Sequence, residues 1–160
     1  MKKINFKYPL MKNNITSNDI NSIIKFLKQN EPILTQSNKV KKFEQEWSKW
    51  LGVKYSVFVN SGSSANLLSM NLIKNIYGEG EVIVPALTWV SDITSVIQNN
   101  LKPKFVDIDQ KNLCMNISEV LKNITTKTKA VFITHAQGFN GLNNKLIREL
   151  KKRKIPLIED

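Results

Sequence analysis

The sequence predicts an α/β protein built on a mostly parallel sheet that is flanked by helices. From residue 54 onward, short β-rich runs alternate with stretches of helical periodicity, which is the pattern of βαβ units. The runs with strand composition are 55–59, 81–84, 104–108, 130–134 and 155–159. The stretches with helical spacing between them are 63–77, 89–99, 118–124 and 143–154. No segment repeats elsewhere in the chain, so a repeat architecture is not expected.

Two amphipathic helices are expected before this alternation begins. Ser17 or Asn18 can cap the first helix, which ends before Pro32. The second spans about 38–51, with Gly52 as its carboxyl-end cap. Its apolar stripe, which we interpret as core, consists of Val40, Phe43, Trp47 and Trp50. We therefore divide the sequence into a helical segment, residues 1–53, and the first part of a sheet domain, residues 54–160.

Composition indicates a globular protein of a reducing compartment. Of the 160 residues, 41% are hydrophobic and 23% are charged, as in ordinary folded domains. Cys114 is the single cysteine, so no internal disulfide can form. Because the chain has neither a long apolar run nor a signal peptide, we expect a cytoplasmic protein without a membrane partner.

The net charge of +11 raises the possibility of a nucleic-acid module. However, 22 of the 24 basic residues are lysines, whereas bidentate contacts to bases and phosphates favour arginine. The densest basic run, 151–154, closes a predicted helix, where cations complement the helix dipole. We therefore expect no nucleic-acid partner.

A polar turn follows the predicted strand 55–59 and opens the next helix. Gly62 allows close backbone approach, and Ser63 and Ser64 add hydroxyl donors to the free N–H groups of the first helical turn. Such a turn suits a phosphate. An ordinary serine cap is the alternative interpretation. The chain has neither the P-loop pattern nor the GxGxxG pattern.

Three further side chains follow predicted strands and are expected at the same sheet edge. Trp89 comes after strand 81–84 and would stack on a planar ring, or fill core, while Thr88 caps the next helix. Asp160 ends the last strand and would pair with a cationic ring nitrogen, or cap a helix. His135 would line the cleft, and no metal is expected because it is the sole histidine. Phosphate, ring and ring nitrogen are what pyridoxal phosphate (PLP) presents.

Seven runs of the sequence resemble the DegT/DnrJ/EryC1/StrS family of PLP-dependent sugar aminotransferases, which have fold type I. The runs, which match in order and spacing, are 34–36, 39–44, 60–67, 84–89, 105–109, 135–138 and 157–160. The resemblance implies that Ser63 and Ser64 hold the cofactor phosphate, that Trp89 stacks on the pyridine ring, and that Asp160 pairs with the ring nitrogen.

The resemblance also implies an activity. A PLP-dependent aminotransferase of this kind would act on a nucleotide-linked keto-sugar in polysaccharide biosynthesis of O-antigen or capsule type, with glutamate as amino donor, and would be a homodimer. An alternative is the branch of 3-dehydratases for CDP-4-keto-6-deoxyglucose, which use pyridoxamine phosphate (PMP). The runs 8–10, 60–68 and 134–141 look closer to that branch. Ser37 and Asn38 stand where the family often has Gly-Pro, which leaves the shape of that loop open.

The catalytic residue stays unassigned, because the family places its Schiff-base lysine, or the dehydratase histidine, beyond Asp160. We expect the sequence to be the amino-terminal portion of a longer protein, with the carboxyl-terminal remainder absent. The 160 residues alone are expected to be inactive. A non-catalytic relative or regulator that keeps the cofactor fold is the remaining alternative.

Overall fold

The structure is a computed structural model that describes residues 13–160. The chain divides into two compact units between Phe58 and Val59, and each is considered by itself. The run 8–10, which favoured the dehydratase branch, lies outside the described residues. Among residues 13–160, no helix combines the length and apolar character needed to cross a membrane.

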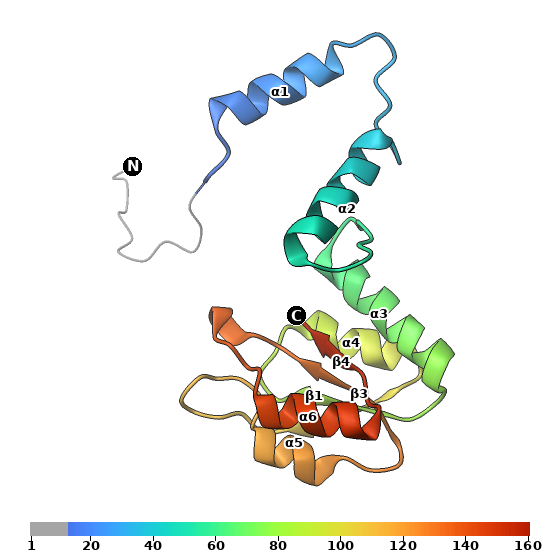
Figure 1. Ribbon diagram of the computed structural model, residues 1–160, viewed down its shortest axis with the longest axis vertical. Coiled ribbons are helices and arrows are strands. Elements are labelled where there is room, and N and C mark those ends of the chain that lie inside the picture. The colour runs from blue at the N-terminus through green and yellow to red at the C-terminus, as the bar shows by residue number, and fades with distance from the viewer. Residues whose placement is uncertain (1–12) are drawn as a thin grey trace, which may run out of the picture. The chain divides into compact units, whose positions relative to one another are not determined.

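The first unit carries two helices, α1 (Ser17–Leu27) and α2 (Asn38–Leu51) (Figure 1). Thr16, one residue earlier than expected, caps α1 through a capping box with Asp19. The Thr16 hydroxyl accepts the Asp19 N–H at 3.3 Å, and the Asp19 carboxylate accepts the Thr16 N–H at 2.7 Å. Gly52 ends α2 with φ of 76°, as its left-handed cap position requires.

Two expectations for the first unit are wrong. The apolar stripe of α2 is not core, because Phe43 and Trp47 remain 47% and 45% exposed and Trp50 remains 74% exposed. The ring centroids of Phe43 and Trp47 are 6.0 Å apart and those of Trp47 and Trp50 are 4.9 Å apart, while Phe43 also packs edge-on against Phe58 at 5.2 Å. The run 55–59 forms no strand, because no neighbouring strand pairs with it in the described chain. Instead, the Phe58 N–H donates to the Glu44 carboxylate at 2.9 Å.

The second unit contains a four-stranded parallel sheet in the order β2-β1-β3-β4. The strands are β1 (Glu81–Pro85), β2 (Lys102–Val106), β3 (Thr128–Ile133) and β4 (Leu157–Glu159). The helices are α3 (Gly62–Tyr77), α4 (Val90–Gln98), α5 (Ile117–Asn123), the short 3₁₀ helix η1 (Ala136–Gly138) and α6 (Asn144–Arg153). The α/β fold class is confirmed, and four of the five expected strands are present.

Both faces of the sheet are buried, which is why its central strands are almost continuously apolar. On one face, Val82, Val84 and Phe132 pack with residues of α3 and α4. On the other face, Ile83 and Val131 pack with residues of α5 and α6. Alternate residues of one strand therefore serve two separate cores, and the sheet forms the middle layer of three (Figure 1).

The strand order places a topological switch point between β1 and β3. From β1 the chain crosses to β2 on one side, and then continues to β3 and β4 on the other side. The connections therefore leave the carboxyl ends of β1 and β3 in opposite directions, and open α/β sheets bind ligands in the crevice between such ends.

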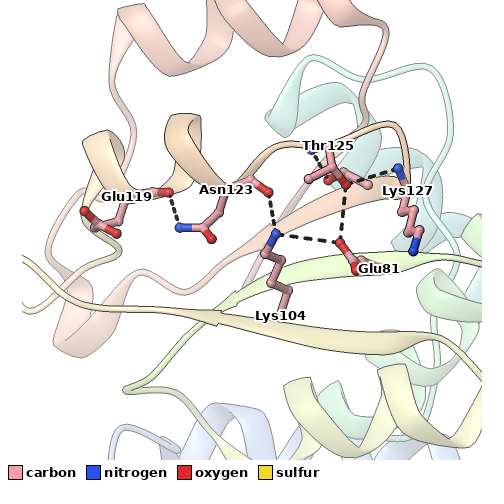
Figure 2. A network of polar contacts seen from close by, with 7 residues as sticks. Glu81, Lys104, Glu119, Asn123, Thr125 and Lys127 are labelled. Atoms are coloured by element: carbon pink, nitrogen blue, oxygen red, sulfur yellow. Dashed lines mark hydrogen bonds and ion pairs between the residues drawn. The ribbon is translucent and has the colours of Figure 1, made fainter.

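A polar network lies around the amino end of β1, at the other end of the strand from this crevice (Figure 2). The Lys104 ammonium donates to the Asn123 carbonyl at 2.9 Å and lies 3.8 Å from the Glu81 carboxylate. The Thr125 hydroxyl donates to the same Glu81 carboxylate at 3.5 Å. These contacts join the end of α5 to β1 and β2, so their role is to hold the fold together.

Candidate functional site

A hollow of about 380 Å³ lies at the switch point, where β1 and β3 end. Three stretches line it: the loop after β1, the loop after β3, and the end of β4. The structure thereby brings together Trp89, His135 and Asp160, which the sequence analysis had placed at one sheet edge. The lining residues are Leu87, Thr88, Trp89, Thr134, His135, Ala136, Gln137 and Asp160.

The first turn of α3 supplies hydrogen-bond donors. Ser61 caps the helix by accepting the Ser64 N–H at 3.1 Å. The Ser64 hydroxyl donates to the Asn60 side chain at 2.6 Å, whereas the exposed Ser63 hydroxyl has no hydrogen bond within the described residues. A Cβ atom at Gly62 would meet no atom within 4 Å, so the backbone here is open to an incoming group. Of the two predicted serines, Ser63 is thus the one with an uncommitted hydroxyl.

Trp89 is not a core residue. The Trp89 side chain is 69% exposed, although the residue lies between the buried strand β1 and the start of α4. The indole face is therefore accessible to a planar ring. The expectation that Thr88 caps α4 is wrong, because the helix begins without a side-chain cap. The Thr88 hydroxyl instead donates to the carboxylate of Asp92.

His135 is held from both sides of its ring. Its Nδ1 accepts the Gly141 N–H at 3.2 Å, which leaves Nε2 to carry the proton of the neutral ring. Nε2 lies 3.0 Å from the Glu159 carboxylate and donates to it in that form. The ring is thus fixed at the mouth of the hollow by two protein contacts.

Asp160 is anchored by its backbone to the end of β3. Its N–H donates to the Ile133 carbonyl at 3.0 Å, and its own carbonyl accepts the His135 N–H at 2.8 Å. Desolvation by the surrounding protein and the nearby Asp92 carboxylate raise the pKa of the Asp160 side chain, while Asn66 and His135 oppose the rise. A cation placed beside Asp160 would lower this pKa and so favour the ionised carboxylate.

Asp92 is a feature of this site that the sequence analysis missed. Its side chain is fully buried at the start of α4, where it accepts hydrogen bonds from Asn66 at 2.8 Å and Thr134 at 2.9 Å in addition to Thr88. The sequence signal that could have indicated it is an acidic residue four positions before Val96, on the face of the helix that is buried.

Comparison with known proteins identifies the family. The profile of the DegT/DnrJ/EryC1/StrS aminotransferase family matches residues 13–160. The chain belongs to this family. It is 32% identical to the GDP-4-keto-6-deoxy-D-mannose 3-dehydratase of Yersinia pseudotuberculosis, over all of this chain and 42% of that protein. It is 31% identical to the GDP-perosamine synthase of Escherichia coli O157:H7, over 80% of this chain and 35% of that protein.

Solved structures of the family have the same fold. The structure of the E. coli GDP-4-keto-6-deoxy-D-mannose-3-dehydratase with bound hydrated PLP superposes with a TM-score of 0.86 at 32% identity. The superposition covers 96% of this chain and 40% of that one. The expected fold type I is confirmed, and the chain spans less than half the length of these relatives.

Proposed function

We propose that the complete protein is a PLP-dependent aminotransferase that acts on a nucleotide-linked keto-sugar in polysaccharide biosynthesis. The observation that carries the proposal is that Trp89, His135 and Asp160 gather at the switch point of a chain that belongs to this family. Relatives of this chain are named for GDP-linked sugars, so the nucleotide we propose is GDP rather than the CDP considered from the sequence.

The first turn of α3, which does not line the hollow, and the residues at the hollow fit PLP in three respects. The first turn of α3 offers the Gly62 backbone and the Ser63 hydroxyl to a phosphate, at the end of the helix where the dipole favours an anion. The exposed indole of Trp89 offers a face to the pyridine ring. The Asp160 carboxylate would pair with a protonated ring nitrogen, and the nearby negative charge of Asp92 would favour the same cation.

Each residue has a distinct task in this proposal. When bound, PLP supplies an electron sink for negative charge that develops on the substrate carbon. Ser63, with help from Ser64, holds the phosphate, and Trp89 covers one ring face and excludes water from it. Asp160 stays ionised and keeps a proton on the ring nitrogen. His135, fixed by Glu159, lies at the mouth of the hollow, where the substrate enters.

The remaining parts of the proposal concern the whole protein. From the family resemblance we propose that the Schiff-base lysine lies beyond Asp160, that glutamate is the amino donor, and that the complete protein is a homodimer. We therefore propose that residues 1–160 are inactive alone and that the complete protein performs the reaction in the cytoplasm.

The test is to purify the complete protein, record its PLP absorbance, and incubate it with GDP-4-keto-6-deoxymannose and glutamate. We expect the absorbance of bound PLP, and a GDP-amino sugar together with 2-oxoglutarate by mass spectrometry. A deoxygenated sugar without nitrogen would replace our proposal with the dehydratase alternative. Bound PLP without turnover of any nucleotide keto-sugar would indicate the non-catalytic relative, and failure to bind PLP or PMP would exclude both enzyme activities.

A further inference from the structure

The buried carboxylate of Asp92 connects three separate elements of the second unit. Asn66 lies on α3, Thr88 lies in the loop after β1, and Thr134 follows β3. All three side chains donate to the two oxygens of Asp92. The described residues provide no lysine, arginine or histidine within ion-pair distance of it, so neutral donors alone satisfy a fully buried carboxylate. A buried carboxylate that loses one of these donors would destabilise the folded protein, because its charge would no longer be fully hydrogen-bonded.

Each donor is close in sequence to a residue that faces the hollow or the phosphate turn. Asn66 is three positions after Ser63, which is about one turn of helix. Thr88 directly precedes Trp89, and Thr134 directly precedes His135. The hydrogen bonds to Asp92 therefore fix the relative positions of the phosphate donors, the stacking indole and the loop after β3.

We propose that Asp92 is a positioning residue, which holds the phosphate turn of α3 and the Trp89 loop in the arrangement that binds the cofactor. The proposal rests on the function proposed above, because the bound group is taken to be PLP. Asp92 does not itself line the hollow, so it acts through Asn66, Thr88 and Thr134.

Asp92 has a second, electrostatic effect that a purely structural residue would lack. Its charge helps to raise the pKa of Asp160, and His135, the other titratable group acting on Asp160, lowers that pKa. PLP binding requires an ionised Asp160, so affinity falls as the pH drops through the Asp160 pKa. Removal of the Asp92 charge lowers this pKa and shifts the acid limb of PLP binding to lower pH.

The experiment measures the dissociation constant of PLP for the apo form of the complete protein, by absorbance titration across a pH series. We expect Asp92→Ala to raise the constant about tenfold or more at neutral pH, because Asn66, Thr88 and Thr134, together with the adjacent Ser91, lose a charged acceptor. Asp92→Asn should recover part of the affinity, since its amide keeps one acceptor, and should bind PLP down to a lower pH than wild type. Ser95→Ala is the matched control: Ser95 is equally buried on α4 and donates to the Asp92 carbonyl at 2.9 Å, away from the carboxylate network.

The outcomes separate the two proposals. If wild type does not bind PLP, the proposed function fails and this inference fails with it. If wild type binds PLP but Asp92→Ala lowers only the melting temperature, with affinity and pH profile as in Ser95→Ala, the proposed function stands and the positioning role is wrong. Should Asp92→Ala not fold, Thr134→Val removes one donor at nearly constant volume. We expect it to weaken PLP binding several-fold, and an unchanged affinity would overturn the inference.

Discussion

Asp160 meets opposite requirements in the free and the cofactor-bound protein. Without a cation beside it, desolvation and the Asp92 carboxylate make its ionised form unfavourable, and its pKa is raised. In the proposed complex, the same surroundings favour a protonated ring nitrogen, because two carboxylates then share one cation. The residue is thus adapted to the complex at the expense of the apo protein.

The first prediction is that Asp160→Asn stabilises the apo protein at neutral pH while it weakens PLP binding. A carboxyl with a raised folded-state pKa contributes stability at low pH and loses that contribution as the pH rises through the folded pKa. The amide imitates the protonated form at every pH, so the melting temperatures of variant and wild type should converge in acid. Thermal melts of both apo proteins across a pH series measure this. Parallel curves over the whole range would contradict the assignment.

Trp89→Ala is expected to separate binding from folding. The side chain is 69% exposed, so the free energy of unfolding of the apo protein should change by no more than about 0.5 kcal/mol. Loss of ring stacking should weaken PLP binding by about two- to tenfold, and Trp89→Phe should restore most of it. Urea unfolding and PLP titration provide the two measurements. A large decrease in the free energy of unfolding would show that Trp89 is a core residue.

Individual side chains also show what a sequence can predict about this site. Trp89, His135 and Asp160 were predicted to share one sheet edge because each comes after a run of strand composition, and parallel strands end at a common edge. Asp92 was missed because two of its donors lie 26 positions before it and 42 positions after it, although Thr88 is only four positions away. Only the folded sheet brings these donors to one carboxylate.

At the scale of elements, two of the predicted helix ends are confirmed, whereas the predicted Thr88 cap of α4 is wrong. Gly52 ends α2 and Asn143 begins α6, with the Asn143 side chain accepting the Lys145 N–H at 2.7 Å. The run 55–59 was not predictable, because strand composition has no effect without a partner strand. Tyr55, Val57 and Phe58 therefore stay more than half exposed outside any sheet. The apolar stripe of α2 likewise lacks a neighbouring element in its own unit.

Gly80, directly before β1, provides a test of the element packing. A Cβ atom there would lie 2.3 Å from the Lys127 carbonyl oxygen, which is backbone and accepts the Glu81 N–H at 2.8 Å. Gly80→Ala should therefore push β1 and β3 apart at their amino ends and lower the free energy of unfolding by about 1–3 kcal/mol. Urea denaturation of the apo protein measures this change.

Gly62→Ala is the matched control for that variant. Its added Cβ atom meets nothing within 4 Å, and it lies in the first turn of α3, where alanine suits the helix. We expect stability to be unchanged or slightly increased. Equal destabilisation by both substitutions would show that the close approach at Gly80 is not what limits the packing.

At the scale of the whole molecule, both units present apolar helix faces to solvent. Residues on α1, α2 and α3 that are at least 40% exposed are Ile20, Ile23, Ile24, Leu27, Phe43, Trp47, Trp50, Leu51, Leu67, Leu68, Leu72, Ile76 and Tyr77. Helix faces with this many exposed apolar side chains are uncommon on a monomer that functions alone. The chain spans 42% of the length of the Yersinia relative.

We therefore predict that residues 1–160, produced alone, bind the dye ANS more strongly per mole than the complete protein does. The dye fluoresces on exposed apolar surface, and the isolated chain should also form soluble aggregates as its concentration rises. Dye fluorescence and light scattering measure the two effects. Equal dye binding by both proteins, with a monomeric isolated chain, would show that nothing further covers these helices.

The network around Glu81 and Lys104 lies at the amino end of β1 (Figure 2). The hollow, in contrast, opens where β1 and β3 end. Substitutions in the loops after β1 and β3 therefore leave these ties between α5 and the sheet intact. For protein engineering, this separation means that the proposed substrate site can be varied by loop libraries at one end of the sheet. Thermostability can be improved independently at the other end.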